Sequence, residues 1–146
     1  MKKLLVSLFA LAIVVTGFAQ ETKDTKATDL VSFATVKHDF GKIKQGVPVT
    51  YDFVFKNISK DPVVISSATA SCGCTTPTWP QKPVPAKKSD KIKAGFNAAN
   101  LGSFTKTIHV NINGANQPLD LTITGEVLNA EEYEKYESSK KTETTN

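Results

Sequence analysis

The sequence predicts an all-β domain built as an antiparallel sandwich of two sheets. Two stretches carry this prediction, because "VTYDFVFKN" (residues 49–57) and "PLDLTITGEV" (residues 118–127) alternate apolar and polar side chains with a period of two. That period is typical of strands buried on one face. Asn, Gly and Pro mark turns between such stretches. About seven short strands in one domain are typical of an immunoglobulin-like sandwich, and a small barrel is the alternative.

Four further segments complete the expected sheets, at residues 32–41, 62–70, 91–96 and 103–113. Each is short and bounded by turn residues, and no segment before residue 129 shows a convincing helical period. The side chains expected to face the core are Val49, Tyr51, Phe53, Phe55, Ile92, Ala94, Phe96, Phe104, Ile108, Val110, Ile112, Leu119, Leu121, Ile123 and Val127.

The first 19 residues have the layout of a secretory signal peptide. Lys2 and Lys3 precede an apolar run from Leu4 to Val15, and small residues lead to a cleavage point after Ala19. The apolar run is shorter than the roughly 20 residues that a membrane-spanning helix needs. We therefore expect a periplasmic or secreted protein with no membrane span after cleavage.

The rest of the chain divides by composition into three parts. Residues 20–29 are polar without periodicity and predict a flexible lead-in. Residues 30–129 hold all the strand patterns and form the expected domain. Residues 130–146 are polar again and predict a mostly disordered tail, in which the spacing of Glu131 and Lys135 allows a short helix.

Charge and composition exclude several classes of function. The formal net charge of +4 falls to +2 when Lys2 and Lys3 leave with the leader, and the chain contains no arginine. Nucleic-acid readers rely on arginine for bidentate contacts, so we expect no nucleic-acid partner. No Ser/His/Asp spacing, supported carboxylate pair or glycine-rich phosphate loop is present. We therefore expect no enzyme, no catalytic residue and no resident cofactor.

Both cysteines of the chain, Cys72 and Cys74, lie one residue apart in "SCGCTT". In an extended chain their Cα atoms would be about 6.4–7 Å apart, at the outer limit for a disulfide, and Gly73 can bend the backbone to close that gap. A ring of three residues would add little stability, and such a bond should be easily reduced. The other reading is that the sulfurs simply pack under the following loop, beside Trp79.

A metal site is the third possibility for Cys72 and Cys74. Two thiolates on one extended segment suit copper(I), which needs no further ligand, or zinc. A structural zinc site takes four ligands and would also need His38 and His109, which lie on segments not obviously adjacent. Copper is therefore the metal we consider for this pair.

The segment "TTPTWPQKPVPAKKSDK" contains the only tryptophan, Trp79, and a lysine cluster formed by Lys82, Lys87 and Lys88. An aromatic platform with a basic rim suits an acidic protein surface or a glycan. The simpler reading is a connecting loop whose indole covers one end of the core. These four residues are the candidate partner-binding set.

Four ordered blocks resemble the bacterial family known as domain of unknown function 1573, over about residues 38–127. The blocks are Asp39-Phe40-Gly41, Lys56-Asn57, Cys72-Gly73-Cys74-Thr75 and Gly125-Glu126-Val127. The resemblance implies an exported immunoglobulin-like domain, similar to cilium- and centrosome-associated modules, and it implies no reaction. Our hypothesis is an envelope interaction or structural module with a protein partner. The alternative is a periplasmic thiol protein that binds copper or exchanges disulfides through Cys72 and Cys74.

Overall fold

The computed structural model describes residues 24–143, so the expected leader at residues 1–19 lies outside the described residues. The strands in chain order are β1 (Val31–Phe33), β2 (Lys37–Lys44), β3 (Val49–Asn57), β4 (Ile65–Ala70), β5 (Thr75–Thr78), β6 (Ser89–Phe96), β7 (Gly102–Ile112) and β8 (Leu119–Leu128). Helix α1 (Ala27–Leu30) precedes them and helix α2 (Ala130–Glu143) follows. Neither helix of this part of the chain has the length and apolar character needed to cross a membrane.

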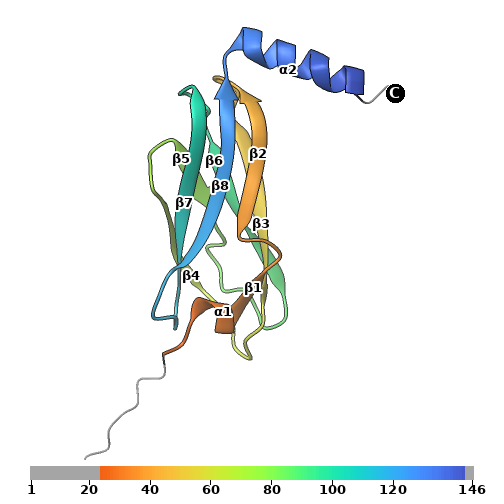
Figure 1. Ribbon diagram of the computed structural model, residues 1–146. Helices are drawn as coiled ribbons and strands as arrows, with labels where there is room; N and C mark the ends of the chain where they lie inside the picture. Colours follow the sequence, from red (N-terminus) through yellow and green to blue (C-terminus); the bar gives the residue numbers. More distant parts are fainter. Residues whose placement is uncertain (1–23, 144–146) are drawn as a thin grey trace, which may run out of the picture.

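The strands form two four-stranded sheets, in the orders β1-β3-β6-β5 and β2-β8-β7-β4. The sheets pack face to face, with α1 at one end and α2 at the other (Figure 1). All ladders are antiparallel except the one between β2 and β8, which is parallel. The predicted two-sheet sandwich is therefore confirmed, and it has eight strands in the described chain where about seven were expected.

The core lies between the sheets and is built by the predicted alternation. Phe53, Ile92, Ile108 and Leu121 are fully buried, and each comes from a strand that alternates inward and outward positions. Burying a large apolar side chain stabilises a fold by about 1.5–3 kcal/mol, so these faces hold the sheets together. Tyr51 and Val49 lie at the edge of the core and are only partly buried.

The opening strand expected over residues 32–41 is two strands in different sheets. β1 pairs with β3, whereas β2 pairs with β8 in the other sheet. The chain changes sheets between them at Thr35, whose hydroxyl donates to the Lys37 carbonyl (2.7 Å) and accepts from the Lys37 N–H (3.2 Å). This local turn satisfies the backbone where it leaves one ladder for the other.

β5 is a strand where the sequence predicts a loop. It pairs only with β6, through the register from Thr75↔Phe96 to Thr78↔Lys93. Pro77 lies within it, and a proline is tolerated on an edge strand because its missing N–H can face away from the ladder. The segment predicted as a connecting loop therefore begins with a short edge strand.

Both polar ends of the domain also differ from expectation. In the lead-in, Ala27 is buried, and Asn116 donates from its backbone N–H to the Thr25 carbonyl (2.9 Å). The part of residues 20–29 that the structure describes is therefore tied to the β7–β8 turn. The tail expected over residues 130–146 is helical from Ala130 to Glu143. Asn129 caps this helix, because its side-chain oxygen accepts from the Glu132 N–H (2.9 Å).

Candidate functional site

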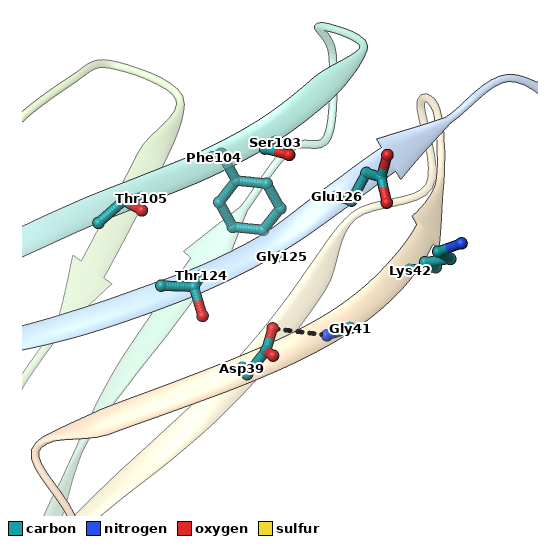
Figure 2. Close-up of a pocket in the computed structure, with 9 residues that line it drawn as sticks. All are labelled: Asp39, Gly41, Lys42, Ser103, Phe104, Thr105, Thr124, Gly125 and Glu126. Atoms are coloured by element: carbon teal, nitrogen blue, oxygen red, sulfur yellow. Dashed lines mark hydrogen bonds between the residues drawn. The ribbon is translucent and has the colours of Figure 1, made fainter.

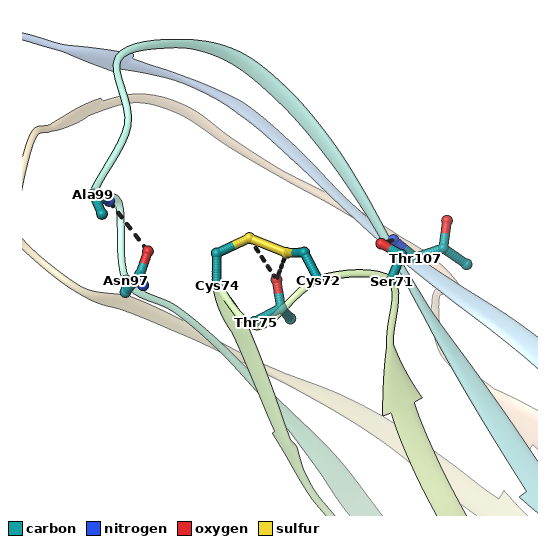
Figure 3. The surroundings of a disulfide bond; sticks show 7 residues. All are labelled: Ser71, Cys72, Cys74, Thr75, Asn97, Ala99 and Thr107. Carbon is teal, nitrogen blue, oxygen red and sulfur yellow. Dashed lines mark hydrogen bonds between the residues drawn. A yellow bond between two sulfur atoms is a disulfide. The ribbon is translucent and has the colours of Figure 1, made fainter.

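Cys72 and Cys74 lie in the loop between β4 and β5 and are joined by a disulfide (Figure 3). Their Cα atoms are 5.3 Å apart, closer than an extended chain would place them. Gly73 between them has open space where a side chain would be. Of the three states considered for the pair, the structure has the disulfide.

The threonine that follows the pair contacts both sulfurs. The Thr75 hydroxyl lies 3.7 Å from Cys72 Sγ and 4.0 Å from Cys74 Sγ, and Thr75 is only 4% exposed. Its position is fixed because it opens strand β5 opposite Phe96. A buried hydroxyl at this distance from sulfur can donate a weak hydrogen bond to it.

Three loops join at this end of the sandwich, which we call the disulfide end: residues 45–48, 71–74 and 97–101. The Gly46 N–H donates to the Ala98 carbonyl (2.9 Å), and the Asn97 N–H donates to the Cys74 carbonyl (3.1 Å). Val47 and Leu101 project from these loops with 50% and 53% of their surfaces exposed. Backbone hydrogen bonds therefore hold the loops of the disulfide end together, and these loops carry exposed apolar side chains.

A cavity of about 100 Å³ opens beside the disulfide. Cys74 and Leu101 line it, together with the rings of Phe96 and Phe104, which stack 4.0 Å apart. Lys106 is the only charged residue among those that line it. The alternation of β7 places Lys106 on the inward side between Phe104 and Ile108, where both neighbours are buried. A charge at an inward position was the one sequence signal for this residue, and sequence reasoning missed it.

The structure does not bring the candidate partner-binding set together with the cysteines. Trp79 packs against the core and is partly buried. Lys87 and Lys88 lie just before β6 and are exposed, and their backbones form hydrogen bonds with the backbone of Asn57. The cysteines lie beside Asn97, just after β6 ends. Lys82 is exposed between these points. The lysine cluster and the disulfide are thus at opposite ends of β6.

Among residues 24–143, no further side chains gather around the cysteines to complete a zinc site. In the described residues, no group of three or more His, Cys, Asp or Glu side chains could hold a metal ion. The His38 ring stacks on Tyr51 at 3.6 Å, and His109 Nδ1 lies 2.6 Å from Asp120 Oδ1. A disulfide offers no thiolate, so copper binding would require the reduced pair.

A second concavity, of about 400 Å³, lies over β2, β8 and β7 (Figure 2). Asp39, Gly41, Gly125 and Glu126 line it, and they come from the first and last of the four sequence blocks. The blocks meet because β2 and β8 pair in parallel. Asp39 accepts from the Gly41 N–H (2.9 Å), and the Phe104 ring occupies the space beside Gly125. These residues have a structural role in the sheet at this point. Their contact explains why the first and the last of the four sequence blocks occur in the same chain.

The fold and the disulfide end define an immunoglobulin-like sandwich with a cysteine pair in an end loop. The family model described as a protein of unknown function (DUF1573) matches residues 31–127. The chain belongs to this family. A comparison with curated protein sequences gave no significant match.

Solved structures share the fold at low sequence identity. The chain is similar to a protein of unknown function from Porphyromonas gingivalis W83, with TM-score 0.58 and 12% identity over 66% of this chain and 46% of that one. A PapD-like domain of human CEP192 has TM-score 0.54 and 11% identity, over 88% and 99% of the two chains. The VesB protease of Vibrio cholerae has TM-score 0.54 and 13% identity, over 69% and 33%. The chain thus spans less than half of the Porphyromonas and Vibrio chains.

Proposed function

We propose that this protein is an exported, non-enzymatic module of the bacterial envelope that binds a protein partner through the disulfide end. The observation that carries the proposal is the exposure of Val47 and Leu101 there, on loops joined by backbone hydrogen bonds. Loops clustered at one end of a sandwich, on a rigid frame, are where such folds place their binding residues.

Export rests on two further observations. Residues 1–19 have the composition of a cleaved leader, and the cysteines form a disulfide, which persists in oxidising compartments outside the cytosol. The periplasm or the cell surface is therefore the compartment we propose. Immunoglobulin-like and PapD-like sandwiches are fold-level analogies here and assign no partner by themselves.

Site-specific photo-crosslinking tests the proposal. A photoreactive residue is placed at Leu101 in the disulfide end or at Ile58, which is similarly exposed (49%) at the opposite end of the sandwich. We expect a discrete protein adduct in the envelope fraction from position 101 and none of the same mass from 58. Val47→Ser should reduce that adduct about fivefold, as expected for loss of one apolar interface contact.

Two outcomes would contradict the proposal. Absence of any protein adduct at position 101 would mean that the disulfide end contacts no partner in the envelope. The same adducts from positions 101 and 58 would mean non-specific contact. Purified chain with each substitution should unfold at the same temperature as the wild type, which excludes misfolding as the cause.

A further inference from the structure

We propose that the Cys72–Cys74 disulfide is an exchange site, which oxidises pairs of cysteine thiols in other exported proteins. The proposal goes beyond partner binding, and the exchange is stoichiometric, so it adds no catalytic turnover to the non-enzymatic module. It stands on four features of the disulfide end. These are the small ring, the loop that is held without it, the cavity beside one sulfur, and two side chains placed to stabilise a thiolate.

The bond contributes little to holding the fold. A ring closed by residues two apart restricts the unfolded chain by only about 1.6 kcal/mol in the loop-entropy model. The loop also has its own backbone hydrogen bonds, from Ser71 N–H to the Thr107 carbonyl (2.9 Å) and from Asn97 N–H to the Cys74 carbonyl (3.1 Å). The loop can therefore stay in place when the bond opens, so that reduction of the pair leaves the protein folded.

The two half-buried cysteines have different surroundings. Cys74 lines the cavity, whereas Cys72 does not. Figure 3 shows Cys74 on the side of the bond toward Asn97 and Ala99, and Cys72 on the side toward Ser71 and Thr107. A thiolate attacks a disulfide sulfur from the side opposite the leaving sulfur, so a thiolate that enters by the cavity attacks Cys74 and releases Cys72.

Each sulfur leaves in one of the two steps, Cys72 in the first and Cys74 in the second, and one side chain lies near each. The Thr75 hydroxyl is nearer to Cys72 Sγ (3.7 Å) than to Cys74 Sγ (4.0 Å) and can donate to a thiolate there. Lys106 lines the same cavity as Cys74, the sulfur that leaves in the second step. A nearby positive charge favours thiolate over thiol, which makes the departing sulfur a better leaving group.

The reaction needs no other reagent than the substrate dithiol. The first substrate thiolate bonds to Cys74 Sγ, and the electron pair of the disulfide leaves with Cys72 Sγ, which takes up a proton. The second substrate thiolate then attacks the substrate sulfur bonded to Cys74, and Cys74 leaves and takes up the second proton. The substrate loses two electrons and two protons and becomes a disulfide, while Cys72 and Cys74 become thiols.

A single-turnover experiment with oxidised protein tests this scheme. The substrate is a synthetic peptide with two reduced cysteines on a flexible spacer, and samples are quenched by alkylation and analysed by mass spectrometry. We expect one peptide disulfide for each Cys72–Cys74 pair reduced, with the protein still folded. A peptide with one cysteine should stop at the mixed disulfide, with the adduct on Cys74 and the alkyl group on Cys72.

Substitutions at the cavity test the two stabilising side chains. Lys106→Met should slow the single-turnover rate about tenfold, and Lys106→Arg should restore it, because the charge is retained. Lys93→Met is the matched control, since Lys93 is exposed on the outer side of β6. Thr75→Val should also slow exchange, whereas Thr75→Ser keeps the hydroxyl and should not.

The outcomes separate the proposal from a purely structural disulfide. If the peptide stays reduced, or if the pair is reduced only after denaturation, the exchange site is overturned. An adduct on Cys72 would overturn the assignment of the cavity as the route of entry. Equal rates for Lys106→Met and Lys93→Met would remove Lys106 from the mechanism. Each result is independent of the crosslinking at position 101.

Discussion

The ring of Phe104 lies directly against Gly125, its cross-strand partner on β8. A β-carbon at Gly125 would stand 2.8 Å from two ring atoms and 2.9 Å from the Gly41 carbonyl oxygen. The ring in turn stacks on Phe96 in the opposite sheet. The missing side chain at position 125 therefore lets an aromatic ring join the two sheets at the disulfide end.

Gly125→Ala should destabilise the fold by about 1–3 kcal/mol, because an added methyl group has to displace both the ring and the backbone of β2. Urea unfolding followed by circular dichroism measures this loss. Gly73→Ala is the matched control, since nothing lies within 4 Å of its added β-carbon. Equal midpoints for the two variants would contradict the packing argument.

The disulfide should contribute little to stability. Replacing Cys72 and Cys74 together by Ala is expected to cost about 1–2 kcal/mol, since the ring they close restricts the unfolded chain only slightly. Phe53→Ala, in the centre of the core, should cost about 3–5 kcal/mol. Urea unfolding of both variants under the same conditions makes the comparison. A loss for the cysteine variant as large as that for Phe53→Ala would show that the bond is a structural staple.

Asn57 is fully buried and fixes the β3–β4 connection. Its side-chain nitrogen donates to the carbonyls of Asp61 (2.8 Å) and Val84 (2.9 Å), and its oxygen accepts from the Ser59 N–H (2.9 Å). Asn57→Ala should cost about 2–4 kcal/mol, because several buried hydrogen bonds are lost together. Thermal unfolding measures the free energy of unfolding of this variant and of a control, Asn111→Ala, on the exposed side of β7. The control should stay within about 0.5 kcal/mol of the wild type.

His38 should make the fold less stable in mild acid. Burial lowers the pKa of His38 below its ordinary value of 6.5, although the Asp39 carboxylate opposes part of this shift. The unfolded chain therefore binds the proton at a higher pH than the folded chain does. The stability is complete above pH 6.5 and falls as the pH drops from there toward the folded-state pKa.

His38→Phe tests this dependence while keeping an aromatic ring against Tyr51. The decrease in the free energy of unfolding between pH 7.5 and pH 5 should be smaller for the variant than for the wild type. Carboxylate titrations occur in both proteins and cancel in the comparison. An identical decrease in the two proteins would mean that His38 titrates alike in the folded and unfolded chains.

The alternating patterns predicted the central strands well. The stretch at residues 49–57 is β3, and the inward residues expected on β6, β7 and β8 are buried. Alternation works there because each strand has one face on the core and one in solvent. Alternation does not identify the edge strand β5. This strand has only four residues, and only its hydrogen-bonded ladder with β6 makes it a strand.

The candidate site was only partly visible in the sequence. The cysteine spacing identified the pair, but the choice among disulfide, metal and packing depends on how the loop brings the two Cα atoms to 5.3 Å. Thr75 and Lys106 were missed, because their relation to the sulfurs arises only when β5 and β7 approach the same end of the sandwich. Lys87 and Lys88, from the candidate partner-binding set, lie at the end of β6 away from the disulfide.

By itself, the sequence determined the fold class, the central strands and their inward faces, because period-two alternation is a local property of the chain. Tertiary structure decided which strands share a sheet and that the chain changes sheets at Thr35. It also decided that Asp39-Phe40-Gly41 meets Gly125-Glu126-Val127 and that Lys106 shares a cavity with Cys74. These relations join residues far apart in the chain, so they depend on how strands pair within each sheet and on how the two sheets pack.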